Sequence, residues 1–321
     1  MVGAFMRFLL YLNTIAIILL AGALVRLYEG APLPWAEPPV ALAADPAPSA
    51  PAPSPPLTAE QYAALQLPLP HPARAPAVAP DAGPVKLRLL TEGDYPPFNY
   101  RGAGGGLTGF DVEIANALCA RLRAECSFEL RPWNDLVLAL KRGEGDAVVA
   151  SMLIPVPGRE APATDDGVVF TERYYSTPGH FAARRTGAPV AATPAALAGK
   201  RIAVQAGSVH HAYVRHRFPE ARPLALPTLT EAQAALAGGD ADLLFADRNA
   251  LLRWTAAGEG ACCRLAGSGY GDPAWFGEGA GIALRAGDEA LRDRFNAALE
   301  ELVADGTYAR ISARYFANNI Y

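Results

Sequence analysis

The sequence predicts an α/β protein of two lobes built on one plan. From Lys86 onward, short apolar strands alternate with amphipathic helices, which is typical of parallel, doubly wound sheets. One pattern occurs twice: a helix, a glycine, an Asp-Ala pair, an apolar strand and a polar residue run through residues 136–151 and again through 232–247. The repetition indicates two α/β lobes, each with a polar residue at the carboxyl end of a strand.

The residues before this part predict export. Arg7 precedes an uncharged apolar run over residues 8–25, which is short for a membrane span and long for the core of a signal peptide. Residues 1–30 are therefore predicted to be a signal peptide or a membrane anchor. The folded part is expected in the periplasm, tethered to the inner membrane through residues 8–25 if the segment is not cleaved. Residues 31–83 are an Ala/Pro/Ser mixture with little to bury, which predicts an extended linker.

Charge and motifs exclude several functions. The 28 Lys and Arg against 32 Asp and Glu include no basic run, so nucleic-acid binding is not expected. A G-x-G-x-x-G spacing exists at Gly104, Gly106 and Gly109, but a dinucleotide site needs its first glycine directly after a strand, and about a dozen residues intervene here. His210 and His211 are adjacent on a predicted helix and point in different directions, a poor metal pair. We predict no catalytic group, metal or cofactor.

The first lobe begins with a strand over residues 86–90 and an acidic, aromatic and proline-rich turn over 92–98. In the turn, Tyr95 and Phe98 either fill the core or form one wall of a small-molecule cleft, since open α/β sheets bind ligands at strand ends. A helix opens after the glycine-rich bend, with Asp111 as its N-cap. The pattern then predicts a strand over 127–130, a helix over 134–142 and a short strand over 146–151.

Periodicity stops after residue 151, and a proline-broken loop over 154–167 carries Arg159. The second lobe follows, with a strand over 179–183, a strand over 201–205, helices over 209–217 and 230–237, and a strand ending at Asp247. The last predicted helices cover 289–304 and 307–316, and the first of these has a clean apolar stripe.

The cysteines permit one disulfide. Cys119 and Cys126 are seven residues apart, at the end of a helix and the start of a strand, and an exported chain can oxidise them. Metal binding is the alternative, but neither a histidine nor a third cysteine is near. Cys262 and Cys263 are adjacent, where a bridge would be strained, and no role is assigned to them.

Isolated polar groups at the lobe edges match what a free amino acid requires. Arg159 is suited to a carboxylate, which it can pair with through two hydrogen bonds. Ser208 and Val209 open a helix, whose first backbone N–H groups favour an anion. Asp247 is suited to the α-ammonium of the ligand. Tyr95 and Trp133 can sandwich its side chain, and Glu92 can reach the far end of that side chain.

The stretches that follow one another along residues 86–321 include YPPF, LTGFDVEIANALC, GDAVVASM, LAGKRIAVQAGS, WFGEGAGIAL, DGTYARI and YFANNIY. This series resembles the periplasmic solute-binding proteins for polar amino acids that serve ABC importers, and among them the lysine/arginine/ornithine and histidine binders. The resemblance implies a two-lobe periplasmic-binding-protein fold of type II (Venus-flytrap), with two hinge crossings and a Cys119–Cys126 disulfide. It also implies stacking by Tyr95 and Trp133, carboxylate contacts by Ser151, Arg159 and Val209, ammonium binding by Asp247, and a distal contact by Glu92.

The implied organisation is residues 84–181 plus 282–321 as lobe 1 and 182–281 as lobe 2. The implied activity is capture of a polar, in particular basic, L-amino acid by a monomer, and its delivery to an ABC transporter permease. The sequence departs from the family at Leu153, where a Ser or Thr is usual, and around Arg159, where residues are inserted. Two alternatives on the same scaffold are a cyclohexadienyl dehydratase-like enzyme, with Glu92 or Glu172 as its acid, and an accessory protein of a periplasmic quinoprotein dehydrogenase.

Overall fold

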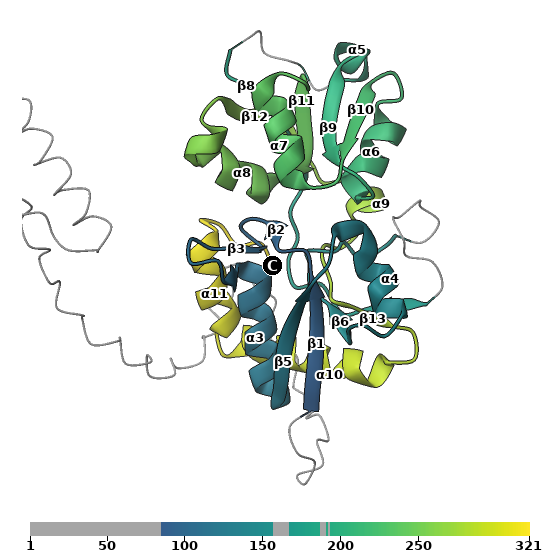
Figure 1. Ribbon diagram of the computed structural model, residues 1–321, viewed down its shortest axis with the longest axis vertical. Helices are drawn as coiled ribbons and strands as arrows, with labels where there is room; N and C mark the ends of the chain where they lie inside the picture. The colour runs from purple at the N-terminus through teal and green to yellow at the C-terminus, as the bar shows by residue number, and fades with distance from the viewer. Residues whose placement is uncertain (1–84, 157–166, 187–190, 192) are drawn as a thin grey trace, which may run out of the picture. The chain divides into compact units, whose positions relative to one another are not determined.

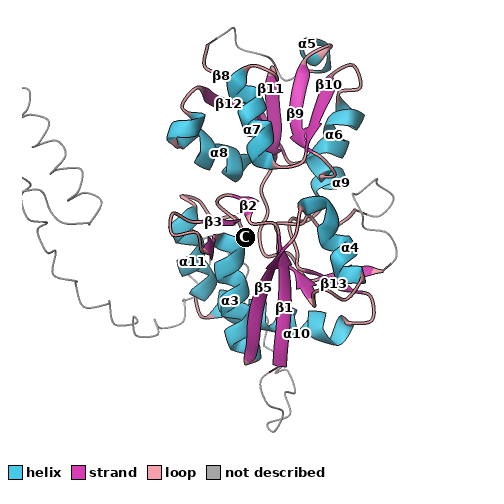
Figure 2. Cartoon of the chain, in the orientation of Figure 1, coloured by secondary structure: helices cyan, strands magenta, loops and turns pink. Residues whose placement is uncertain are grey.

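Two five-stranded mixed sheets, each with helices on both faces, make up most of the described chain (Figure 1, Figure 2). The computed structural model describes residues 85–156, 167–186, 191 and 193–321. The expected signal peptide or anchor, the linker and Arg159 lie outside these residues. Within them, no helix is both long enough and apolar enough to cross a membrane.

The first sheet has the strand order β5-β1-β6-β13-β7. Its strands are β1 (Val85–Thr91), β5 (Ala124–Leu130), β6 (Ala147–Val148), β7 (Val168–Phe170) and β13 (Ala283–Arg285). Its helices are α3 (Phe110–Leu122), α4 (Leu136–Lys141), α10 (Glu289–Ala304) and α11 (Thr307–Tyr315), with a 3-10 turn η1 (Trp133–Asp135) before α4. A small sheet, β2 (Asp94–Tyr95), β3 (Asn99–Arg101) and β4 (Leu107–Thr108), lies between β1 and α3 in the chain.

Successive side chains of β1 point to opposite faces of the sheet, because a strand is pleated, and they pack into two different hydrophobic cores. Leu89 packs with buried residues of α3, α10 and α11, whereas Leu90 packs with α4, and both leucines are fully buried. The apolar run of β1 therefore identifies a central strand covered on both faces.

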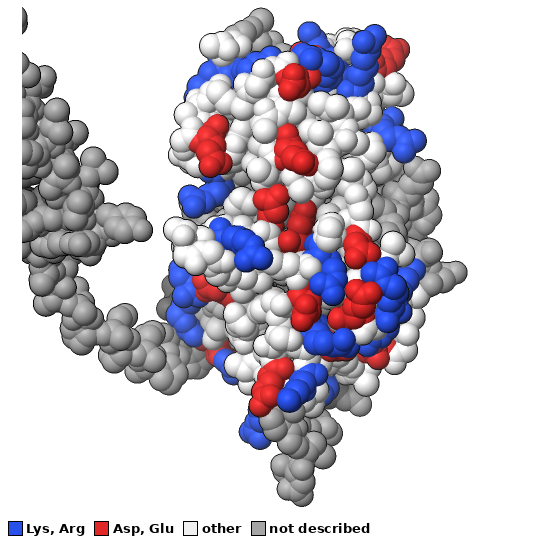
Figure 3. Space-filling model, viewed as in Figure 1, with Lys and Arg blue, Asp and Glu red and all other residues white. Residues whose placement is uncertain are grey.

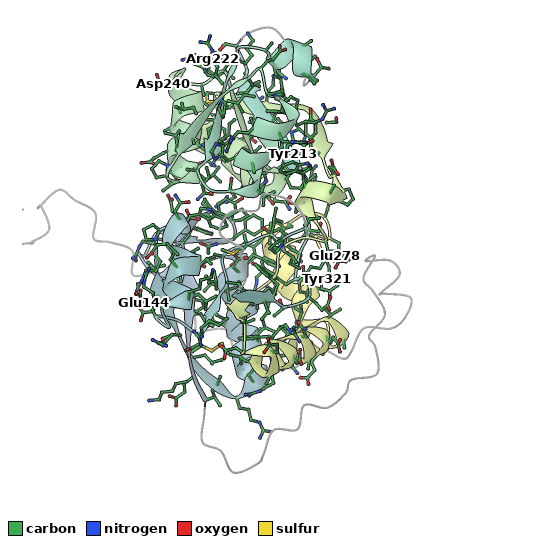
Figure 4. The ribbon with its side chains drawn as sticks, turned by 90° about the vertical axis from the view of Figure 1, so that its right-hand side faces the viewer. Glu144, Tyr213, Arg222, Asp240, Glu278 and Tyr321 are labelled. Atoms are coloured by element: carbon green, nitrogen blue, oxygen red, sulfur yellow. A yellow bond between two sulfur atoms is a disulfide. The ribbon has the colours of Figure 1, made fainter. Side chains whose placement is uncertain are left out.

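The second sheet has the order β10-β9-β11-β8-β12. Its strands are β8 (Gly179–Arg184), β9 (Arg201–Gln205), β10 (Arg222–Leu226), β11 (Leu243–Asp247) and β12 (Cys263–Tyr270). Its helices are α5 (Pro194–Leu197), α6 (Val209–Arg217), α7 (Leu229–Gly238), α8 (Arg248–Ala256) and α9 (Pro273–Phe276), with a 3-10 turn η2 (Gly258–Gly260). Helices α7 and α8 share one core with Ala203 and Leu244, and α6 and α9 share another with Val204 and Phe245. Tyr213 of α6, labelled in Figure 4, stacks on Phe245 with ring centroids 5.5 Å apart.

The expectation of parallel sheets is correct for only part of each sheet. β5, β1 and β6 are parallel, as are β10, β9 and β11, but β13 and β7 in the first sheet and β8 and β12 in the second are antiparallel to their neighbours. The reason lies in the path of the chain, which crosses between the sheets through residues 171–178 and again through 271–282. β8 enters the second sheet beside the carboxyl end of β11, with Gly179 opposite Asp247, and must run the other way.

Asp111 is not the N-cap of α3, contrary to the prediction. The helix is capped by Gly109, whose φ is 124° and whose Cα hydrogen faces the carbonyl of Phe98, where a Cβ would stand 2.2 Å from the oxygen. Asp111 is instead inside the first turn and fully buried. The close approach of backbone to backbone excludes a side chain at position 109, and the cap lies two residues before the predicted position at Asp111.

Cys119 of α3 and Cys126 of β5 form the expected disulfide, with Cα atoms 6.2 Å apart. Cys262 and Cys263, at the start of β12, are also joined to each other.

Replacing Cys119 and Cys126 together with alanine is expected to lower the free energy of unfolding by about 2–3 kcal/mol, because the bridge closes a short loop in the unfolded chain. Urea titration of the oxidised protein measures the loss. The matched control is the double alanine variant of Cys262 and Cys263, whose bridge closes almost no loop. An equal loss in both variants would contradict the loop-closure explanation.

Candidate ligand site

One cleft is lined by residues from both sheets, at the carboxyl ends of their parallel strands. The first sheet contributes Glu92, Tyr95, Trp133, Asn134, Val137, Ala150, Ser151, Met152 and Leu153, and the second contributes Gln205, Gly207, Ser208, Val209 and His210. The empty space, counting that open to solvent, is about 720 Å³. Carboxyl ends of strands are where open α/β sheets hold ligands.

Six of the eight predicted binding residues line this cleft: Glu92, Tyr95, Trp133, Ser151, Ser208 and Val209. Arg159 lies outside the described residues. Asp247 is not part of the cleft wall but is close behind it, because the backbone of Asp247 bonds to the phenol of Tyr95. Burial, followed by the charge of Asp247, raises the pKa of Tyr95 well above its ordinary value, so this phenol stays protonated.

The carboxylate of Asp247 is largely occupied by protein donors. Its Oδ1 accepts hydrogen bonds from the backbone N of Asn249 at 2.7 Å and of Ala250 at 3.1 Å, which caps α8. Its Oδ2 accepts a hydrogen bond from Thr177 in the crossing segment. A carboxylate offers about four acceptor positions, so one remains for an incoming ammonium. Burial raises the pKa of Asp247 to about 6, and these bonds oppose the shift.

Ser208 acts as a helix cap. Its Oγ accepts from the backbone N of His211 at 3.1 Å and donates to the carbonyl of Gln205 at 2.8 Å, so the hydroxyl is occupied within its own lobe. The cap fixes the start of α6 at the cleft, where the first N–H groups of the helix, beginning with Val209, lack acceptors inside the helix. The anion-binding capacity of this turn therefore belongs to its backbone.

Glu92 meets the second sheet directly. Its Oε1 accepts a hydrogen bond from Nε2 of Gln205 at 2.5 Å. Burial, and then the neighbouring charge of Asp94, raise the pKa of Glu92 to about 8, while the bond from Gln205 opposes the shift. Asp94 itself accepts a hydrogen bond from Thr230 of α7 at 2.8 Å. A half-buried carboxyl whose hydrogen-bond partner is an amide, and not a cation, is a favourable site for a cation.

Gln205, Asn134 and His210 line the cleft but were missed by sequence reasoning. His210 packs against Phe245 and Phe276 with ring centroids 5.7 and 5.6 Å apart, and burial lowers its pKa to about 4, so it is neutral near pH 7. The predicted position of Gln205, at the end of a strand, was the available signal for its role. His210 adjoins the predicted anion site at Ser208 and Val209, which also marked it as a candidate.

The polar groups of the described residues form no cluster of three or more His, Cys, Asp or Glu side chains that could hold a metal. On the face shown in Figure 3, basic and acidic side chains are interspersed.

The fold and the cleft between its sheets define a two-lobe periplasmic binding protein. The chain belongs to the bacterial extracellular solute-binding proteins of family 3, whose model matches residues 87–318. It is 32% identical over 231 residues to ABC transporter arginine-binding protein 1 of Escherichia coli, covering 72% of this chain and 90% of the relative. It is 34% identical over 241 residues to the L-arginine-binding protein of Pseudomonas aeruginosa, covering 73% and 89%.

Solved structures agree with this assignment. A Salmonella typhimurium periplasmic binding protein described for high arginine specificity matches with a TM-score of 0.65 at 27% identity, over 73% of this chain and all of that one. A Silicibacter pomeroyi binding protein in complex with lysine matches with a TM-score of 0.63 at 28% identity, over 73% and 100%. These relatives are binding proteins, so the expectation of binding without turnover is confirmed at the level of the family.

Proposed function

We propose that the protein captures a free L-amino acid with a cationic side chain in this cleft and delivers it to an ABC importer. The observation that carries the proposal is Glu92, a half-buried carboxyl that faces the cleft with an amide as its partner. Relatives named for arginine or for lysine/arginine/ornithine binding support it.

The roles proposed for the other residues follow the chemistry of the ligand. Arg159 and the backbone N–H of Val209 bind its carboxylate, and Asp247 binds its ammonium through the acceptor position that the protein leaves open. Tyr95 and Trp133 hold the aliphatic part of the side chain between them. Ser151 lines the cleft with both of its donors in use, because its hydroxyl donates to Asp111 and its backbone N–H donates to Tyr174.

Closure of the cleft is proposed to follow ligand binding. Two bodies move: residues 84–181 plus 282–321, and residues 182–281. The boundary between them is placed at Gly179 instead of residue 182, because β8 begins there and belongs to the second sheet. The crossing segments are the hinge. A ligand that contacts both lobes binds the closed state better and shifts the population toward it.

The proposed partner is a permease that the closed monomer meets in the periplasm. The segment over residues 8–25 is proposed to tether the protein to the inner membrane, with residues 31–83 as the spacer. Carbonate extraction of membranes tests the tether: an anchored protein stays in the pellet, and a processed one is found in the soluble fraction.

Calorimetry across the twenty L-amino acids and ornithine tests the proposed function. Arginine, lysine or ornithine is expected to bind with a Kd in the micromolar range or below, and citrulline, the neutral analogue of arginine, at least about tenfold more weakly. Arg159→Ala is expected to weaken binding about 100-fold, because it leaves the ligand carboxylate without its charged partner.

The matched control is Arg101→Ala, which removes an exposed arginine that bonds the carbonyl of Gly105 in the bend after β3. Tight binding that survives Arg159→Ala, or a clear preference for neutral amino acids, would contradict the assignment.

A further inference from the structure

Asp111 is a fully buried carboxyl that the proposed function does not use. Its Oδ2 accepts hydrogen bonds from Nδ2 of Asn99 at 2.9 Å and from Oγ of Ser151 at 2.8 Å. Its Oδ1 accepts a third from the phenol of Tyr174 at 2.9 Å. All three donors are neutral, so the carboxyl is held by hydrogen bonds rather than by an ion pair.

The partners of Asp111 extend to two segments of the cleft wall. The Tyr174 phenol accepts a hydrogen bond from the backbone N of Ser151 at 3.0 Å, so Ser151 is held at both its backbone and its hydroxyl. The Oδ1 of Asn99 accepts from the backbone N of Gly93 at 2.9 Å, directly after Glu92. One carboxyl thereby connects the ends of β1 and β6.

The backbone at both ends of this network has the left-handed conformation. Ser151 has φ of 56°, which is uncommon for a residue with a side chain, and Gly93 has φ of 80°. Such a conformation at Ser151 persists only where the surroundings impose it. The two bonds to Ser151 supply that constraint on the wall of the cleft.

A buried carboxyl is a poor choice if stability alone is required. Burial raises the pKa of Asp111 to about 6, and the bonds from Asn99, Ser151 and Tyr174 oppose the shift. Taking a carboxylate out of water costs several kcal/mol, and the three groups that bond Asp111 are neutral. The cost of burying this group is better explained by geometry than by stability.

We propose that Asp111 is a positioning residue for ligand binding, which fixes the backbone of Ser151 and of Gly93 on the cleft wall. The proposal rests on the proposed function for its consequence, but the positioning itself is a property of the ligand-free protein. It can therefore be tested with and without a ligand.

Hydrogen exchange of the full chain without ligand is the first test. Asp111→Ala is expected to speed exchange at the amides of Gly93 and Ser151 at least about tenfold, since both lose the constraint on their acceptors. The matched control is Leu118→Ala, which opens a cavity two turns further along the same helix at another fully buried position. Equal exchange at these two amides in both variants would overturn the proposal.

Two further variants keep the test decisive. Asp111→Asn retains an acceptor for two of the three donors and is expected to restore most of the protection. Tyr174→Phe keeps the ring but removes the hydroxyl between Asp111 and Ser151 N, and should expose the Ser151 amide even if Asp111→Ala does not fold.

Calorimetry with the amino acid that wild type binds is the second test. Asp111→Ala is expected to weaken binding at least about tenfold, and Leu118→Ala less than about threefold at a similar loss of Tm. If the two variants lose affinity in the same proportion to their loss of Tm, Asp111 has only a structural role and the proposal is overturned. If wild type binds no amino acid, the proposed function fails, and the exchange measurement still decides the positioning role.

Discussion

Replacing Gly207 with alanine is expected to weaken ligand binding about fivefold, the effect of about 1 kcal/mol, which is the low end of overpacking costs because the opposing atom ends a side chain that can turn. Gly207 is in the second lobe, and a Cβ there would stand 2.1 Å from Oδ1 of Asn134 in the first. Because the two residues meet only when the lobes are together, the clash opposes closure. Calorimetry with the amino acid that wild type binds measures the loss.

A double-mutant cycle separates this clash from local strain. Gly207 has φ of 69°, which alanine adopts at a cost within its own lobe whether the cleft is open or closed. Asn134→Ala removes the opposing side chain, so Gly207→Ala should cost much less affinity in that background. An equal loss of affinity in both backgrounds would show that the loop of the second lobe, and not contact between the lobes, is responsible.

The apolar pattern predicted the elements well because it follows from burial. The strand at residues 86–90 and the helix at 289–304 were correct since each presents apolar residues to a core at a period that the backbone sets. The direction of the later strands was not predictable in this way. Whether β8 runs parallel or antiparallel depends on where the chain enters the second sheet, and no local period encodes that.

The site divides along similar lines. Glu92 and Ser151 were expected at a cleft because the carboxyl ends of parallel strands meet at one edge, and both line the cleft beyond the ends of β1 and β6. Asp111 was predicted as a helix cap, because the type of residue suits a cap and the pattern does not show the approach of Gly109 to Phe98. Gln205 acquires its role only through its contact with Glu92 in the other lobe.

Replacing Glu92 with glutamine is expected to stabilise the ligand-free protein at alkaline pH. Because the pKa of Glu92 is raised from 4.5 to about 8 in the folded protein, the folded state binds a proton more tightly than the unfolded state. The stability of wild type due to this group is present below pH 4.5 and is lost as pH rises toward 8. Glutamine does not titrate, so its advantage over glutamate grows through this window.

Urea titrations at pH 5 and pH 8.5 measure the change, which we expect to favour the glutamine variant by about 2–4 kcal/mol more at the higher pH, below the limit that 1.36 kcal/mol per pKa unit sets. Asp111 and Asp247, each with a pKa of about 6, titrate in both proteins and cancel in the comparison. A constant difference between the two proteins across this range would show that Glu92 ionises normally.

The same substitution is expected to weaken binding of arginine or lysine at least about 30-fold, since the cation would lose the carboxylate that bonds it at the far end of the cleft. Binding of citrulline should change little, because a neutral side chain needs no carboxylate. The two outcomes have opposite signs: glutamine improves the empty protein and impairs the loaded one. This combination distinguishes a residue retained for ligand binding from one retained for folding, and a variant that lost both stability and affinity would place Glu92 in the second group.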